Sequence, residues 1–221
     1  DMPAALQASA SAPQPSDLPL AVVKLGGSIV RGGTLAGWLD VIADVERPVV
    51  LVPGGGALAD EVRHCQRQLG FGDVTAHRMA LLAMDQLAWA IAGMTPGYEV
   101  GSTIENLRVL IQRRLVPVWA PSALLADRTD VEATWRLTSD SLALWLAGKL
   151  GAQSCCVVKS AAMAHRPVSA DMLRNDGIVD DAFPSMLAET GVATAIFGRG
   201  DEGGLAAFLA GEGPAPNPVT A

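Results

Sequence analysis

LAVVKLGGS, residues Leu20–Ser28, is an apolar run that leads through a lysine directly into two glycines. Residues 21–25 are apolar or β-branched apart from Lys24, which predicts a buried strand. Glycine has no Cβ, so the backbone of Gly26 and Gly27 can come within hydrogen-bonding distance of a phosphate. Lys24 at the end of the strand would meet the negative charge, so this stretch predicts half of an anion site.

A second stretch, VVLVPGGGALADEV (Val49–Val62), repeats the design. Its continuous apolar start predicts a strand covered on both faces, as in a parallel sheet. Gly54, Gly55 and Gly56 then turn the chain into a helix. Two glycine-rich turns that each close a strand predict two halves of one anionic site.

Strands and helices alternate along the rest of the chain. The predicted strands cover residues 21–25, 49–52, 116–120, 155–158 and 192–197. The predicted helices cover residues 34–45, 57–69, 75–91, 103–115, 138–150, 181–190 and 202–209. This order predicts an α/β fold, a three-layer αβα sandwich with a mainly parallel central sheet. We expect one domain over residues 20–210, a disordered tail over 1–19 and a C-terminal tail over 211–221.

Composition excludes several classes of function. The 221 residues carry a net charge of −7, which leaves no basic surface for nucleic acid. No apolar stretch is long enough to span a membrane, and the first 19 residues contain no Lys or Arg of the kind that begins a signal peptide. The cysteines have no metal-ligand spacing and fit a reducing compartment. We therefore expect a cytoplasmic protein without a nucleic-acid or membrane partner.

The candidate chemistry gathers where the predicted strands end, because ligands of open α/β sheets bind at the carboxyl edge. That edge collects Lys24 with Gly26, Gly27 and Ser28, then Gly54–Gly56, then Lys159 after its strand. Asp140 joins them from the first turn of a helix that Thr138 or Ser139 would cap. Alone, a Gly-Gly pair is as often a plain turn, and a lone lysine is usually a solvated charge. Together these groups favour phosphoryl transfer.

Several motifs in one order resemble the amino acid kinase superfamily. They are VVKLGGS, the VPGGG turn, HRMALLAMD, APSALLADRTD, TWRLTSDSLALWLAGKLGA, VDDAFP and FGRG. The resemblance covers roughly residues 20–210. Within the superfamily the chain is most similar to the (5-(aminomethyl)furan-3-yl)methyl phosphate kinases of methanofuran biosynthesis.

The resemblance implies a reaction in which ATP, with Mg²⁺, phosphorylates a small-molecule phosphate monoester to its diphosphate. Lys24, Asp140 and Lys159 would be the catalytic residues. Gly26, Gly27, Ser28 and Lys159 would bind the nucleotide, and Asp140 would orient the lysines and a metal-bound water. No protein side chain is assigned as a metal ligand.

The same resemblance implies where the acceptor binds. Gly54, Gly55 and Gly56 would hold its phosphate, and His77, Asp85 and Ser139 would bind the rest of the molecule. Arg78, Trp119, Asp130 and Trp135 are further candidates to meet an aminomethylfuran. The alternative for the tryptophans is core packing, and for His77 a local hydrogen bond. Relatives are usually homo-oligomers, and residues 75–91 form a helix apolar enough to cover a partner or the core.

One segment departs from the family pattern. Many relatives place an acidic residue and a glycine soon after the strand that corresponds to residues 155–159, whereas this chain has Ser160-Ala161-Ala162-Met163-Ala164. A later lysine of several relatives is also absent, and Arg174 or Arg199 are the candidates to replace it. A non-catalytic ligand-binding, storage or regulatory subunit of the same fold is therefore the alternative function.

Overall fold

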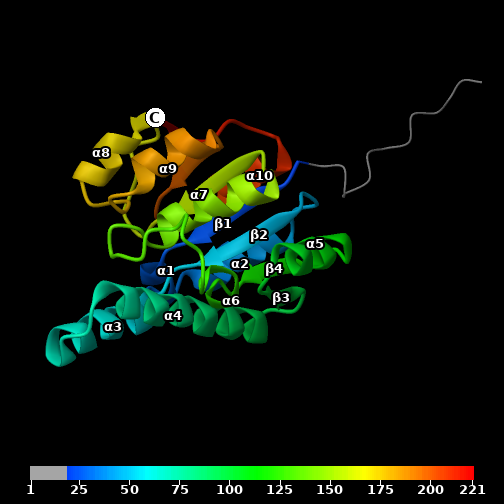
Figure 1. Ribbon diagram of the computed structural model, residues 1–221. Helices are drawn as coiled ribbons and strands as arrows, with labels where there is room; N and C mark the ends of the chain where they lie inside the picture. The colour runs from blue at the N-terminus through cyan, green and yellow to red at the C-terminus, as the bar shows by residue number, and fades with distance from the viewer. Residues whose placement is uncertain (1–18) are drawn as a thin grey trace, which may run out of the picture.

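Eight strands form one sheet in the computed structural model, which describes residues 19–221 (Figure 1). Their order in the sheet is β3-β4-β2-β1-β5-β7-β8-β6, and every pair is parallel except β7 with β8. The strands are β1 (Ala21–Leu25), β2 (Val49–Pro53), β3 (Tyr98–Gly101), β4 (Val116–Trp119), β5 (Ser154–Val158), β6 (Val168–Ser169), β7 (Ala193–Phe197) and β8 (Pro218–Thr220).

Helices cover both faces of this sheet, which confirms the predicted three-layer αβα sandwich with a mainly parallel sheet. In Figure 1, α7 lies across the near face, and α3 and α4 run along one end of the sheet. The helices are α1 (Gly27–Arg31), α2 (Leu35–Ala43), α3 (Gly56–Leu69), α4 (Asp73–Met94), α5 (Ile104–Gln112), α6 (Ser122–Leu125), α7 (Ser139–Leu150), α8 (Ala170–Asn175), α9 (Phe183–Thr190) and α10 (Glu202–Ala210). In the described part of the chain, no helix is long and apolar enough to cross a membrane.

Successive side chains of β1 point to opposite faces of the sheet, so the position of each residue in the strand decides which face it packs on. Val22 packs in the hydrophobic cluster beneath α7 and α9, whereas Val23 and Leu25 pack in the cluster beneath α2 and α10. Lys24 shares the parity of Val22. Its side chain therefore points to the face that α7 covers, near the carboxyl end of the strand.

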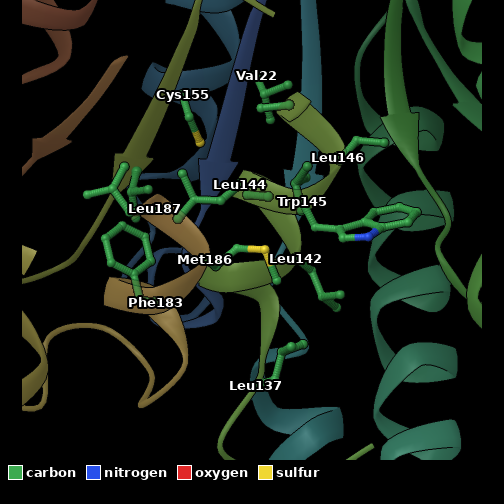
Figure 2. Close-up of a cluster of buried hydrophobic side chains, with 14 of the residues drawn as sticks. Val22, Leu137, Leu142, Leu144, Trp145, Leu146, Cys155, Phe183, Met186 and Leu187 are labelled. Carbon is green, nitrogen blue, oxygen red and sulfur yellow. The ribbon is translucent and has the colours of Figure 1, made fainter. Parts of the chain in front are cut away.

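The core beneath α7 fixes where that helix begins. Leu142, Leu144 and Leu146 are at most 1% exposed, and they pack with Phe183 and Leu187 of α9 (Figure 2). Each fully buried leucine contributes roughly 1.5–3 kcal/mol. Because residues 140–147 of α7 are all buried, its first turn is held against the carboxyl edge of the sheet.

Some expected element boundaries were wrong. The predicted tail over residues 211–221 contains β8, because the Asn217 main chain and the residues after it pair with β7. The glycine turn after β1 is the start of α1. β3 was not expected because its four residues, YEVG, include the exposed Glu99 and do not form a continuous apolar run. The predicted helix over residues 75–91 runs from Asp73 to Met94. The tail predicted over residues 1–19 lies, apart from Pro19, outside the described residues.

Candidate functional site

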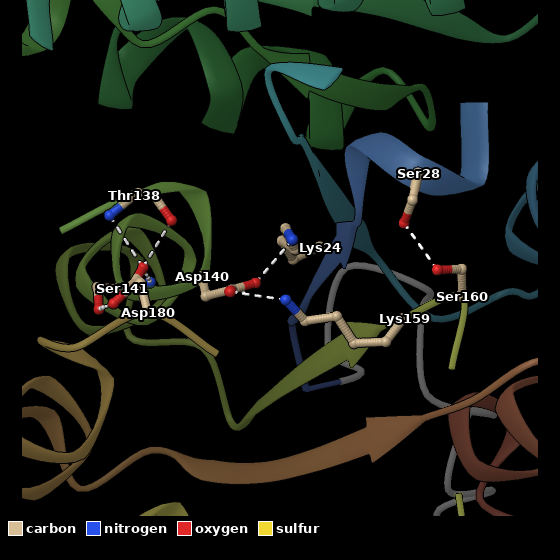
Figure 3. Close-up of polar contacts among 8 residues, drawn as sticks. All are labelled: Lys24, Ser28, Thr138, Asp140, Ser141, Lys159, Ser160 and Asp180. Carbon is tan, nitrogen blue, oxygen red and sulfur yellow. Dashed lines mark hydrogen bonds and ion pairs between the residues drawn. The ribbon is translucent and has the colours of Figure 1, made fainter. Parts of the chain in front are cut away.

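Two lysines and one aspartate form a buried ion cluster at the carboxyl edge of the sheet (Figure 3). Lys24 Nζ lies 2.6 Å from Asp140 Oδ1, and Lys159 Nζ lies 2.6 Å from Asp140 Oδ2. The exposed fractions of the three side chains are 3% for Lys24, 6% for Asp140 and 16% for Lys159. The structure thus brings together the three residues predicted to be catalytic, with the more exposed Lys159 nearest to solvent.

The sheet register explains why the two lysines meet. Lys24 pairs with Val157 of β5, and Leu25 pairs with Val158, so Lys159 follows directly beyond the end of β1. The Lys159 amide donates to the Phe197 carbonyl, which fixes the backbone as it leaves β5. Adjacent parallel strands therefore deliver both ammonium groups to one point.

Asp140 stays ionised between the lysines. Burial raises the pKa of Asp140, but the charges of Lys24 and Lys159 outweigh burial and bring the pKa to about 2. The residue also lies in the first turn of α7, where the helix dipole favours a carboxylate. A fixed carboxylate can orient both ammonium groups.

Lys159 is the titratable member of the cluster near neutral pH. Burial and the neighbouring charge of Lys24 lower the pKa of Lys159 to about 8, although Asp140 opposes them. Lys159 is therefore a cation at neutral pH that loses its proton in mildly alkaline solution.

The two glycine-rich segments touch each other. A Cβ on Gly27 would lie 2.3 Å from the Gly56 Cα, and one on Gly54 would lie 2.7 Å from the Gly27 nitrogen. Only glycine allows this approach. Gly56 also has φ +53°, a left-handed conformation that glycine adopts without strain. The structure therefore joins the two predicted half-sites into one.

The glycine segments lie beside the ion cluster. A Cβ on Gly26 would be 3.6 Å from Lys24 Nζ and 3.8 Å from Ser28 Oγ. The amides of Gly26 and Gly54 donate to the Val158 and Leu25 carbonyls, so these amides hold the turns in place. As at every helix N-terminus, the first turns of α1 and α3 leave main-chain amides without i−4 partners, and such amides suit an anion.

Three of the predicted acceptor residues line one pocket. Gly55, His77 and Ser139 surround it together with Trp135 and apolar side chains of α4 and α7. Burial lowers the pKa of His77, so its imidazole is neutral at neutral pH. Asp140 follows Ser139 in α7 but does not itself line this pocket.

Asp85 has a different position. Its Oδ1 accepts a hydrogen bond of 3.1 Å from the Ser122 amide, and its Oδ2 accepts one from Ser122 Oγ. The carboxylate thus caps the start of α6, and the structure does not bring it together with Gly55, His77 and Ser139. Its substrate role stays a prediction.

Two further candidates for the acceptor ammonium are structural. Trp119 is fully buried and stacks on Trp145, with 6.1 Å between the ring centroids. Asp130 is paired with Arg128 at 2.6 Å and with Lys149 at 3.6 Å. Core packing, the alternative for the tryptophans, therefore holds for Trp119.

Trp135 is placed differently from Trp119. Its indole Nε1 donates to Gln66 Oε1 at 2.7 Å, and the Arg63 guanidinium lies 4.1 Å from the ring centroid. These contacts from α3 hold the loop before α7 over the pocket. Trp135 thus supplies an aromatic wall beside His77.

The segment that departs from the family pattern closes the other end of the site. Ser28 Oγ donates to Ser160 Oγ at 2.9 Å, which links α1 to the segment after β5. Arg199 holds the same segment, since its amide donates to the Ala161 carbonyl and its Nε to the Ser160 carbonyl. Ser160–Ala164 is therefore an ordered wall with a guanidinium beside it.

The side chains present do not form a metal site of their own. Among residues 19–221, no group of three or more His, Cys, Asp or Glu side chains is arranged to hold a metal ion. Both oxygens of Asp140 are already paired with ammonium groups. The donor set is cationic, which suits phosphate oxygens rather than Mg²⁺.

Sequence reasoning missed Asp180, which holds the start of α7. Its Oδ2 accepts from the Thr138 amide and hydroxyl, each at 2.9 Å, and from the Ser141 amide at 3.1 Å. Its Oδ1 accepts from Ser141 Oγ. Thr138 occupies the N-cap position, but the cap comes from Asp180 and not from the side chain of Thr138 or Ser139. The two acids directly before the helix at residues 183–190 were the available signal.

Comparisons with known proteins identify the family of the chain. The family model described as "Amino acid kinase family" matches residues 19–162. The [5-(aminomethyl)furan-3-yl]methyl phosphate kinase of Methanocaldococcus jannaschii is 29% identical over 133 residues, which are 58% of this chain and 60% of that protein. The chain therefore matches less than two thirds of the length of this relative.

Solved structures share the fold at low sequence identity. The uridylate kinase of Archaeoglobus fulgidus superposes with a TM-score of 0.67 at 17% identity, over 90% of this chain and 99% of that one. The UMP kinase of Ureaplasma parvum gives a TM-score of 0.68 at 13% identity, over 92% and 99%.

Proposed function

Because the chain belongs to the amino acid kinase family, we propose that it transfers the γ-phosphoryl group of ATP to a small-molecule phosphate monoester. An oxygen of the acceptor phosphate attacks the γ-phosphorus, the bond to the β-phosphate oxygen breaks, and ADP leaves. The product is the diphosphate of the acceptor. The observation that carries this proposal is the pair of ammonium groups that Asp140 holds beside two touching glycine segments.

The ion cluster supplies charge where the transition state needs it. The transferring phosphoryl group carries negative charge on its equatorial oxygens, and catalysis of its transfer is mainly positioning and electrostatic stabilisation. Lys24 and Lys159 are fixed by one carboxylate, so neither ammonium group must reorganise during the reaction. Gly26, Gly27 and Ser28 would line the nucleotide phosphates beside Lys24.

Mg²⁺ would arrive on the nucleotide phosphates, because the described side chains offer it no ligand set. When bound there, it neutralises part of the phosphate charge. Asp140 orients the ammonium groups of Lys24 and Lys159. That it also orients a metal-bound water stays a prediction.

The acceptor would lie in the pocket between α4 and the start of α7. Gly54, Gly55 and Gly56 place the N-terminus of α3 at one end, which suits the acceptor phosphate. Trp135 and His77 line the other end. We propose an aminomethylfuran methyl phosphate, the compound class named for the M. jannaschii relative, as this acceptor. Because the pocket encloses only about 40 Å³, the loop that carries Trp135 must open to admit a ring.

Steady-state assays of the full chain test both parts of the proposal. With Mg·ATP and aminomethylfuran methyl phosphate we expect ADP and the furan diphosphate, and with UMP much lower kcat/KM. Trp135→Ala should raise the KM for the furan acceptor and leave the KM for ATP close to wild type. Turnover with UMP at an equal kcat/KM would contradict the acceptor assignment, and no turnover with any phosphate monoester would contradict the kinase assignment.

A second candidate, a non-catalytic ligand-binding, storage or regulatory subunit, is favoured by Ser160–Ala164, which carries no carboxylate. Calorimetry with Mg·ATP and with inorganic phosphate separates the two functions. Micromolar affinity for ATP supports the kinase. Binding of phosphate with no measurable binding of ATP supports the second candidate.

A further inference from the structure

We propose that Asp180 is a positioning residue of this site, which sets the start of α7 so that Asp140 reaches both lysines and which adds its negative charge to the field at Lys159. The role in catalysis rests on the proposed function, whereas the electrostatic role does not.

The contacts of Asp180 are concentrated on one turn of one helix. Thr138 and Ser141 each donate their amide and their hydroxyl to its carboxylate. These two residues flank Ser139 and Asp140. A carboxylate that holds the backbone on both sides of Asp140 leaves that side chain little freedom, so Asp140 remains directed at Lys24 and Lys159 (Figure 3).

Asp180 itself is fixed by the fold rather than by the lysines. It directly precedes the first turn of α9, whose Phe183 and Leu187 are buried against α7. The Ala182 amide donates to the Arg136 carbonyl at 2.9 Å, which ties the same turn to the chain before α7. The packing of α9 on α7 thus carries Asp180 to the helix start.

The charge of Asp180 has a second effect. Burial and the charge of Asp140 raise the pKa of Asp180, while the four donors from Thr138 and Ser141 favour its ionised form. Lys159 is faced by Lys24 from β1, by Asp140 from α7 and by Asp180 from the turn before α9. Of these, Lys24 disfavours the protonated ammonium, and both carboxylates favour it.

This role differs from simple capping in what it predicts. A cap that acts only through the stability of α7 would leave the protonation of Lys159 unchanged as long as the helix stays folded. If Asp180 loses its charge but keeps its shape, the pKa of Lys159 falls, so the ammonium group loses its proton at lower pH.

The test is an NMR titration of the full chain labelled with ¹³Cε-lysine, with Lys159→Arg identifying the Lys159 resonance. In wild type we expect a midpoint near pH 8. Asp180→Asn should lower the midpoint by about 0.5 pH units or more. Ser141→Ala, the matched control, removes one donor and keeps the charge, so its midpoint should stay at the wild-type value.

Equal midpoints in Asp180→Asn and wild type would overturn the proposal. If Asp180→Asn does not fold, Asp180→Ser serves instead, because a serine hydroxyl can still cap the helix without a charge. The basic limb of kcat/KM should shift with the NMR midpoint. Absence of wild-type turnover would contradict the proposed kinase function but not the titration, so the two failures are distinguishable.

Discussion

Asp140 is the residue on which the stability of the site depends. Its carboxylate neutralises two ammonium groups, one of which is 3% exposed. Loss of one partner of a buried ion pair leaves an uncompensated charge, which typically costs about 3–5 kcal/mol. We therefore predict that Asp140→Ala lowers the free energy of unfolding by about that amount in urea titrations.

A double variant provides the control for this prediction. Lys24→Met with Asp140→Leu removes the most buried ammonium group along with the carboxylate, and Lys159 is close enough to the surface to move into water. The double variant should be more stable than Asp140→Ala. If it is less stable, the uncompensated charge is not the cause of the destabilisation.

Lys159 makes the reaction sensitive to pH. Its pKa is lowered to about 8, so the cation that the transition state needs is present below that pH and is lost as the pH rises through it. We predict that kcat/KM falls above about pH 8 in wild type, because kcat/KM reports the titration of the free enzyme. Lys159→Arg should lower kcat but remove this basic limb, because a guanidinium stays charged. If activity still falls above about pH 8 in Lys159→Arg, the group that titrates is not Lys159.

At the scale of elements, the contact between the start of α1 and the start of α3 makes the anion site. The Cβ of Gly27→Ala would lie 2.3 Å from the Gly56 Cα, so the two segments must separate. We predict a loss of about 1–3 kcal/mol in unfolding free energy and a higher KM for both substrates. Urea titrations and steady-state kinetics measure the two effects.

Gly203→Ala is the matched control for Gly27→Ala. Gly203 lies in α10, and nothing lies within 4 Å of the Cβ it would gain. This variant should keep wild-type kinetics and be stabilised by up to about 1 kcal/mol. A comparable loss of activity in Gly203→Ala would show that the kinetics do not report on the contact between the glycine segments.

The elements that sequence alone could predict are those with continuous apolar patterns. β1, β2 and β5 are buried along their whole length, and their short, mainly apolar runs predict strands without knowledge of the rest of the fold. β8 was missed because its three residues, 218–220, are exposed or partly buried and form a strand only by pairing with β7 and β6. The cap of α7 was missed because its carboxylate, Asp180, is about 40 positions away in the sequence.

At the scale of the whole molecule, the parallel sheet brings the site together. Lys24, the glycine segments, Asp140 and Lys159 could be predicted because each follows a strand or begins a helix, and such positions share one edge. The direction of Asp85 could not be predicted. Whether its carboxylate faces Ser122 or the pocket depends on the packing of α6 on α4. The spacing of apolar residues within α4 does not predict that packing.

The outer face of α4 bears on the predicted homo-oligomer. Leu82 is 51% exposed, Trp89 67% and Met94 62%, and Leu82 and Trp89 lie two turns apart on one side. We predict that two copies associate through this face. Leu82→Glu with Trp89→Glu should then halve the mass measured by light scattering, whereas Val109→Glu on α5 should not. A monomeric wild type would contradict the prediction.

The most direct test of the central claim follows the label of [γ-³²P]ATP in a single turnover with aminomethylfuran methyl phosphate. In wild type we predict that the label appears in the furan diphosphate. In Lys24→Ala the rate of that transfer should fall by about 100-fold to 1,000-fold while ATP affinity changes far less, because Lys24 acts on the transition state. Label that remains in ATP or appears only as inorganic phosphate in wild type would contradict the account.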